Sequence, residues 1–97
     1  MPRNHKLTAV VAGRCVQSAA PEPGRLVVVF DDRSTMTVKT AGIATTISIG
    51  AKVKAVLEDG NQCTLQFEDG SSVTVKLANP GASVAVRDGR NAVEYLG

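Results

Sequence analysis

Residues Leu65 to Lys76 read LQFEDGSSVTVK, and apolar and polar residues alternate on both sides of Asp69-Gly70. Alternation around an Asp-Gly pair is a strong short-range signal of a β-hairpin. We therefore expect two short antiparallel strands joined by a tight turn, with Leu65 and Phe67 directed into a core.

An earlier stretch nearly repeats this hairpin. Phe30 to Lys39 (FDDRSTMTVK) aligns without gaps on Phe67 to Lys76 (FEDGSSVTVK), at an offset of 37 residues. Downstream, Gly50 to Val53 resembles Gly81 to Val84 at an offset of 31, so Ile43 to Ile49 has the character of an insertion in the first copy. The pattern favours a duplicated hairpin unit. The alternative is that two tight hairpins converge on similar residues, because turn chemistry and alternation dictate many of them.

The rest of the chain reads as further short strands. We expect a flexible basic amino-terminus over residues 1–6 and a single all-β domain over residues 7–97. Other strands are expected at Leu7 to Val16, Arg25 to Phe30, Thr35 to Lys39, Ile43 to Ile49, Ala51 to Glu58, around Val84 and Val86, and at Ala92 to Leu96. No segment keeps a period of 3.6, which leaves room for a single helical turn at most. The predicted fold is a small SH3-like barrel or compact β-sandwich of about seven or eight short antiparallel strands.

Size and composition narrow the class of protein. The 97 residues suffice for one modest core, and with 3% aromatic residues that core must be aliphatic. The 11 basic and 9 acidic residues nearly cancel, whereas nucleic-acid binders often concentrate a larger basic excess on one face. No signal-like or membrane-spanning run occurs, so the expected location is the cytoplasm.

The residues offer little for catalysis or metal binding. His5 is the single histidine and lies in the expected tail, remote from any nucleophile. Cys15 and Cys63 lack the further ligands of a zinc site, and buried reduced thiols are favoured over a disulfide between them. Acidic pairs such as Glu68-Asp69 fall at turns, where carboxylates accept backbone hydrogen bonds. We therefore expect neither an enzyme nor a cofactor.

Two local motifs carry a resemblance to a fold family. Gly50-Ala51-Lys52-Val53 as a strand start and Phe67-Glu68-Asp69-Gly70 as an acidic-Gly turn resemble the SH3-like and Tudor-like small barrels, over about Gly50 to Leu96. The resemblance implies a barrel and a general habit of binding. The chain departs from the family in lacking the aromatic residues that build a Tudor cage or an SH3 peptide groove, so no ligand carries over.

One candidate binding surface is a polar sheet face. Alternation directs several Lys, Thr and Gln side chains away from the core on neighbouring strands. The candidate site residues are Lys39, Lys52, Lys54, Gln66 and Lys76, accompanied by Thr37, Thr64 and Thr74. Such a stripe is able to follow a phosphate backbone, although stacking aromatics are missing and the same residues suit a solvated face. Nucleic-acid binding is therefore the second of two interpretations.

The first interpretation is an interaction module. Val27, Val29 and Val56 are apolar at positions that simple alternation exposes. They need either cover from elsewhere in the chain, from Leu7 to Val16 or Ile43 to Ile49, or a partner. The sequence thus predicts a non-catalytic small β-barrel that binds a protein partner or itself, as a dimer in the simplest case.

Overall fold

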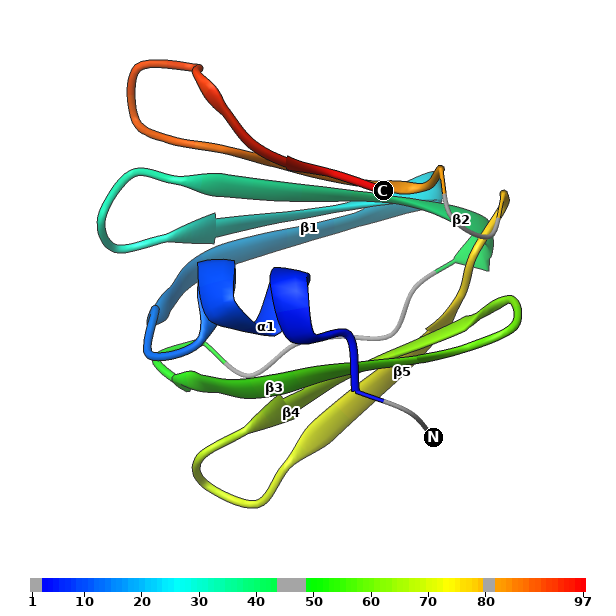
Figure 1. The fold of residues 1–97 in the computed structure, drawn as a ribbon, viewed down its shortest axis with the longest axis horizontal. Coiled ribbons are helices and arrows are strands. Elements are labelled where there is room, and N and C mark those ends of the chain that lie inside the picture. The colour runs from blue at the N-terminus through cyan, green and yellow to red at the C-terminus, as the bar shows by residue number, and fades with distance from the viewer. Residues whose placement is uncertain (1–2, 44–48, 80–81) are drawn as a thin grey trace.

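A computed structural model describes residues 3–43, 49–79 and 82–97, and the all-β prediction is confirmed (Figure 1). The described strands form two antiparallel sheets, one in the order β1-β2-β6-β7 and the other in the order β3-β4-β5. The elements are α1 (His5–Val11), β1 (Val16–Phe30), β2 (Thr35–Ile43), β3 (Val53–Asp59), β4 (Gln62–Phe67), β5 (Ser72–Lys76), β6 (Val84–Arg87) and β7 (Val93–Leu96).

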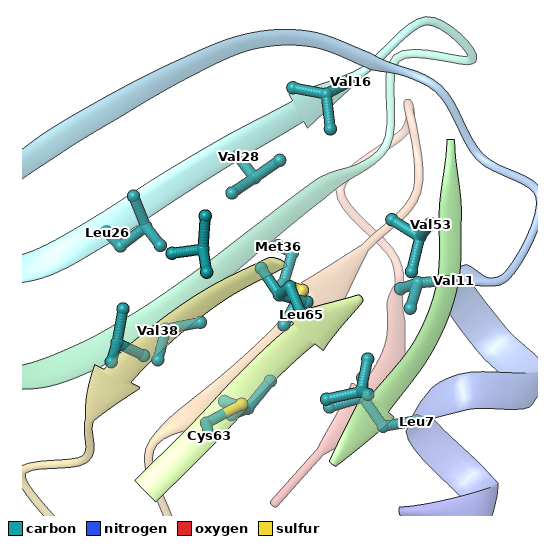
Figure 2. Packing of buried hydrophobic residues seen from close by; sticks show 14 of the residues in the cluster. Leu7, Val11, Val16, Leu26, Val28, Met36, Val38, Val53, Cys63 and Leu65 are labelled. Carbon is teal, nitrogen blue, oxygen red and sulfur yellow. The ribbon is translucent and has the colours of Figure 1, made fainter. Parts of the chain in front are cut away.

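The two sheets enclose an aliphatic core. Leu26, Met36 and Val38 from one sheet and Leu65 and Phe67 from the other are buried. Figure 2 shows Leu26, Met36, Val38 and Leu65 converging between the sheets, with Leu7 and Val11 of α1 closing one side. The inward facing that alternation predicted for Met36, Val38, Leu65 and Phe67 is confirmed.

Strand β1 folds back on itself. The Asp31 amide, just after its end, donates to the Cys15 carbonyl just before its start, at 2.9 Å. Gly24, between the two halves, has a φ of 80°. Figure 1 shows the two halves of β1 running side by side. The Glu68 amide donates in the same way to the Lys52 carbonyl, at 2.9 Å, which closes the β3–β4 hairpin. Each copy is therefore a three-stranded meander.

The two copies share the same turn. In the first, Phe30 N–H donates to Ser34 at 2.9 Å and Asp32 Oδ1 accepts from the Ser34 amide. In the second, Phe67 N–H donates to Ser71 at 2.9 Å and Asp69 Oδ1 accepts from the Ser71 amide. The two hairpins therefore share their turn hydrogen bonds as well as their residues.

The repeat also extends upstream of the two hairpins. Val16 N–H donates to the Ala51 carbonyl at 2.9 Å, and Val53 N–H donates to the Arg14 carbonyl at 3.0 Å. The offset of 37 residues maps Val16 onto Val53 and Arg14 onto Ala51, so each of these two bonds is the counterpart of the other. The structural counterpart of Gly50 to Val53 is therefore Gly13 to Val16, and the two meanders are related by a pseudo-two-fold axis.

The amino-terminal segment differs from its prediction. Residues Leu7 to Val16 were expected to form a strand, but α1 occupies His5–Val11 and exceeds a single turn. Asn4 caps the helix by accepting the Leu7 amide on its side chain, which satisfies one of the helix's first donors. Arg3 and Asn4 belong to the segment assigned to a flexible tail, yet Arg3 bridges to Leu57 on the edge of β3.

In strand β3, the side chains that point into the core after Val53 are not the ones that simple alternation predicts. A register shift lies between Val53 and Ala55, and beyond it Val56 pairs with Leu65. One extra residue in a strand moves every later side chain to the other face. Val56 is consequently fully buried in the same core as Leu7 and Val11 of α1, so the expected cover comes from within the Leu7 to Val16 segment and no partner is needed at this position.

The expectation for Ile43 to Ile49 lies largely outside the described residues.

Candidate functional site

One row of side chains crosses the whole four-stranded sheet. Val27 of β1 pairs with Thr37 of β2, Thr37 pairs with Ala85 of β6, and Ala85 pairs with Leu96 of β7. Directly paired residues in a sheet project from the same face. The adjacent row is buried in the core, so alternation places this row on the opposite side. That buried row consists of Val28, Met36, Val86 and the partly buried Tyr95.

A second row runs parallel to the first. Val29 pairs with Thr35, Thr35 with Arg87, and Arg87 with Val93. We call these two rows together the outer face. Its residues are Val27, Val29, Thr35, Thr37, Ala85, Arg87, Val93 and Leu96.

The outer face is unusually apolar at its β7 end. Leu96 is 68% exposed and Val93 is 47% exposed, and both rank among the exposed large hydrophobic residues of the described chain. Val27 and Val29 at the other end are half-buried. Large apolar side chains exposed together on a sheet face are typical of a site that contacts another molecule.

A shallow depression lies on this face. Its volume is about 350 Å³, and Thr37, Lys39, Ala85 and Leu96 contribute to its lining together with the segment 82–84 and Gly97. The depression follows from side-chain size, because Ala85 stands between the longer Thr37 and Leu96 in the same row. The lining is mainly apolar, with Lys39 at its border.

The charges around the outer face are basic. Arg25 pairs with Lys39 across β1 and β2, and Arg87 lies in the second row. Arg25 is held by Glu22 at 2.7 Å, and the Arg87 guanidinium donates to the Asn91 carbonyl at 3.3 Å. Lys39 is exposed and its ammonium has no hydrogen bond or ion pair with any residue that the structure describes. Lys39 is therefore a cation available to a ligand at this face, with Arg87 as a second whose guanidinium has one long bond to a backbone carbonyl.

The residues predicted from sequence as a binding stripe are divided between the two sheets. Lys39 lies on β2, whereas Lys52 precedes β3, Lys54 lies on β3, Gln66 on β4 and Lys76 on β5. Lys54 and Gln66 come together at a small depression of about 170 Å³ beside the turn at Gly70. Lys76 pairs with Gln62, which lies at the opposite end of β4 from Gln66.

The threonines of that predicted stripe also differ among themselves. Thr64 is buried and shares a hydrogen bond with Thr74 across β4 and β5 at 2.8 Å, whereas Thr37 belongs to the outer face. Residues 39, 52, 54, 66 and 76 thus do not form one continuous surface through their strand pairing. Nucleic-acid binding by them stays a prediction.

The outer face was only partly anticipated. Val27 and Val29 stood out in the sequence as apolar residues at exposed positions, but Ala85, Val93 and Leu96 did not. Their contribution depends on β6 pairing with β2, which is a contact between distant segments. For β7, the sequence signal that could have indicated the outer face is the apolar Leu96 at the end of the expected strand Ala92 to Leu96.

The two cysteines are free thiols, as expected. Cys63 is buried, and burial is the main cause that raises the pKa of its thiol to about 12, with Glu58 adding to the shift. Cys15 is half-buried rather than buried, and its thiol donates to the Gly50 carbonyl at 3.1 Å. Within residues 3–43, 49–79 and 82–97, no cluster of three His, Cys, Asp or Glu side chains is placed to hold a metal ion.

The acidic pairs at turns serve the turns themselves. The Ser34 hydroxyl and amide donate to Asp32 and lower the pKa of its carboxyl, and Arg14 at 3.6 Å adds to this. The Ser71 hydroxyl and amide lower the pKa of Asp69 in the same manner. These carboxylates therefore have structural partners.

Among the described helices, none has the length and apolar character needed to span a membrane. Comparison of the chain with protein-family models, with curated proteins and with solved structures finds no match.

Proposed function

We propose that this chain is a non-catalytic interaction module that binds a protein partner or a second copy of itself through the outer face. The observation that carries the proposal is the row Val27-Thr37-Ala85-Leu96, which continues across all four strands and ends in a leucine that is 68% exposed. Burying a leucine side chain contributes about 1.5–3 kcal/mol, so contact at this row favours association.

The chemistry of the face suits a protein ligand. Val and Thr side chains on a pleated surface offer apolar contact with few groups that demand hydrogen bonds, which is the character of an interface centre. The SH3-like habit of binding, and a location in the cytoplasm, are parts of this same proposal. The surface around Lys54 and Gln66 on the other sheet is the competing site, and the experiment must distinguish it from the outer face.

Photo-crosslinking in the native cell tests the proposal. A photoreactive amino acid replaces Ala85, at the centre of the outer face, or Ser72, an exposed position on β5 of the other sheet. We expect adducts to a protein partner or to a second copy from position 85 and none from position 72. Adding Leu96→Asp should abolish the adducts, because a carboxylate then replaces the most exposed apolar side chain of the row.

Adducts of equal yield from both positions, or adducts to nucleic acid, would contradict the proposal. Sedimentation equilibrium of the purified chain then separates the two kinds of protein partner. Self-association that Leu96→Asp removes identifies the second copy, and a monomer that still gives adducts in the cell identifies a different protein.

A further inference from the structure

The outer face carries more information about its partner than its apolar character alone. Among the described side chains in and beside the two rows, Lys39 and Arg87 are the basic groups with no carboxylate partner, Arg25 is neutralised by its ion pair with Glu22, and the rows themselves contain no carboxylate. Glu94, the neighbour of Val93, is turned to Arg14 instead, with two hydrogen bonds of 3.0 and 2.7 Å. Glu22 is engaged by Arg25.

This charge distribution disfavours a face-to-face dimer. A two-fold contact places the same patch against itself, so Lys39 of one copy, which has no partner among the described residues, would face Lys39 and Arg87 of the other. Like charges brought together at an interface are costly and are used in proteins to suppress wrong partners. The partner that complements this face is therefore acidic at its edges.

The depression adds a steric requirement. Ala85 leaves space between Thr37 and Leu96, and the volume of about 350 Å³ accommodates one large aliphatic side chain together with its neighbours. Lys39 borders the same space and has no partner among the described residues. A carboxylate next to that aliphatic side chain would reach the Lys39 ammonium.

We propose that the outer face binds a segment of another protein in which a large aliphatic residue, seated over Ala85, is flanked by Asp or Glu that pairs with Lys39. This inference rests on the proposed function and names the chemistry of its partner. The binding segment is extended, because the row it contacts is a straight cross-strand track rather than a round pocket.

The test is an NMR titration of the ¹⁵N-labelled chain with two capped peptides. The probe is Glu-Leu-Thr-Val-Thr-Leu-Glu, and its matched control carries Lys in place of both Glu residues. We expect the acidic peptide to shift amide signals of β2, β6 and β7 with a Kd of about 1 mM or tighter. The Kd of the basic peptide should be higher by roughly fivefold or more. Raising the salt concentration should narrow this difference, because exposed charge pairs are screened.

Two variants assign the preference to one side chain. Lys39→Glu should weaken the acidic peptide by roughly fivefold or more, which is what one partly desolvated charge pair contributes. Lys76→Glu, an equal change of charge at an exposed position on the other sheet, should leave the affinity unchanged.

The possible failures are distinguishable from one another. If both peptides shift the outer face equally and Lys39→Glu changes nothing, the acidic preference is overturned while binding through this face stands. If neither peptide shifts the outer face, the acidic-aliphatic segment is overturned, and the crosslinking from position 85 decides the proposed function separately. Shifts confined to the surroundings of Lys54 and Gln66 would likewise overturn the acidic-aliphatic segment at the outer face.

Discussion

Thr8 satisfies the edge of β3 with a single hydroxyl group, which accepts from the Val56 amide at 2.9 Å and donates to the Val56 carbonyl at 3.2 Å. Asn4 adds a backbone bond to the same carbonyl at 2.8 Å. An unpaired strand edge is a site for aggregation, and proteins commonly cover it. Helix α1 therefore protects β3 as well as contributing Leu7 and Val11 to the core.

Thr8→Val should destabilise the fold, because valine keeps the shape of threonine but leaves the Val56 amide without its acceptor. We expect the free energy of unfolding to fall by about 1–2 kcal/mol, the cost of an unsatisfied, partly buried donor. Urea unfolding measures this. Thr8→Ser retains the hydroxyl and should stay within about 0.5 kcal/mol of the wild type. Equal losses in both variants would show that the hydroxyl is not what stabilises this edge.

The pseudo-symmetric turns offer a second experiment. Arg33 and Gly70 occupy equivalent positions and have φ values of 73° and 89°. A left-handed conformation costs a residue with a side chain about 1–2 kcal/mol, offset in part by the larger entropy that glycine loses on folding. We therefore expect Gly70→Arg to lower the free energy of unfolding by about 1 kcal/mol, and Arg33→Gly to raise it slightly.

Thermal and urea unfolding of the two single variants check the opposite signs. Gly70→Asn serves as the control, because asparagine tolerates the left-handed region and should lose less than arginine. Destabilisation by Arg33→Gly as large as that by Gly70→Arg would mean that the Arg33 side chain has a packing role that outweighs its backbone strain.

The hairpins were predictable from sequence because the information that forms them is local. Alternating residues and the acidic turn residues of Phe30 to Lys39 and of Phe67 to Lys76 specify strand, turn and inward face together. Helix α1 was not predictable in this way. Leu7 and Val11 are four residues apart, a spacing that fits one face of a helix and also one face of a strand. The Asn4 cap and the contact with Val56 decide between them, and the latter is a tertiary contact.

The phase of β3 and the extent of the outer face had to come from the structure. The register shift after Val53 depends on how β3 meets β4, and nothing in the alternation of residues 51–58 indicates it. The outer face needs the strand order β1-β2-β6-β7, which joins segments about 50 residues apart. Val27 and Val29 indicated that a covered or binding surface exists, and strand order shows that Leu96 belongs to it.

The two phenylalanines of the repeat should contribute equally. Phe30 and Phe67 are 1% and 2% exposed and precede the same turn in each copy. We expect Phe67→Ala and Phe30→Ala each to reduce the free energy of unfolding by about 3–5 kcal/mol, from lost burial and the cavity that remains. Denaturant titration measures both. A near-neutral result for one of them would show that its meander does not share the common core.

The acid side of the stability profile depends on Asp32 and Asp69. Both have a pKa below the ordinary value of 3.8, first because of the serine hydroxyl two residues later. A lowered pKa in the folded state gives stability that is present above the unfolded value and is lost as the pH falls. NMR titration of the carboxyl carbons should give two midpoints below 3.8. Ser34→Ala should raise only that of Asp32, and Ser71→Ala only that of Asp69. A shift of both midpoints by either variant would contradict these local causes.

The alkaline side of the profile depends on Cys63. Its pKa is raised from 9.0 to about 12 in the folded chain, chiefly by burial, so the folded state holds the thiol proton more tightly than the unfolded state. A raised pKa gives stability that is complete below the unfolded value and is lost as the pH rises. The free energy of unfolding should therefore decline above about pH 9, by up to roughly 1.4 kcal/mol per pH unit from this group.

Urea unfolding at about pH 8 and about pH 10 measures this decline, and Cys63→Ala is the reference, because it loses some packing at both values but has no thiol to titrate. We expect a smaller decline in Cys63→Ala than in the wild type. Reaction with a thiol reagent gives an independent reading, since Cys15 should react in the folded chain and Cys63 only after unfolding. Equal declines in the wild type and Cys63→Ala would show that this thiol does not govern the alkaline stability.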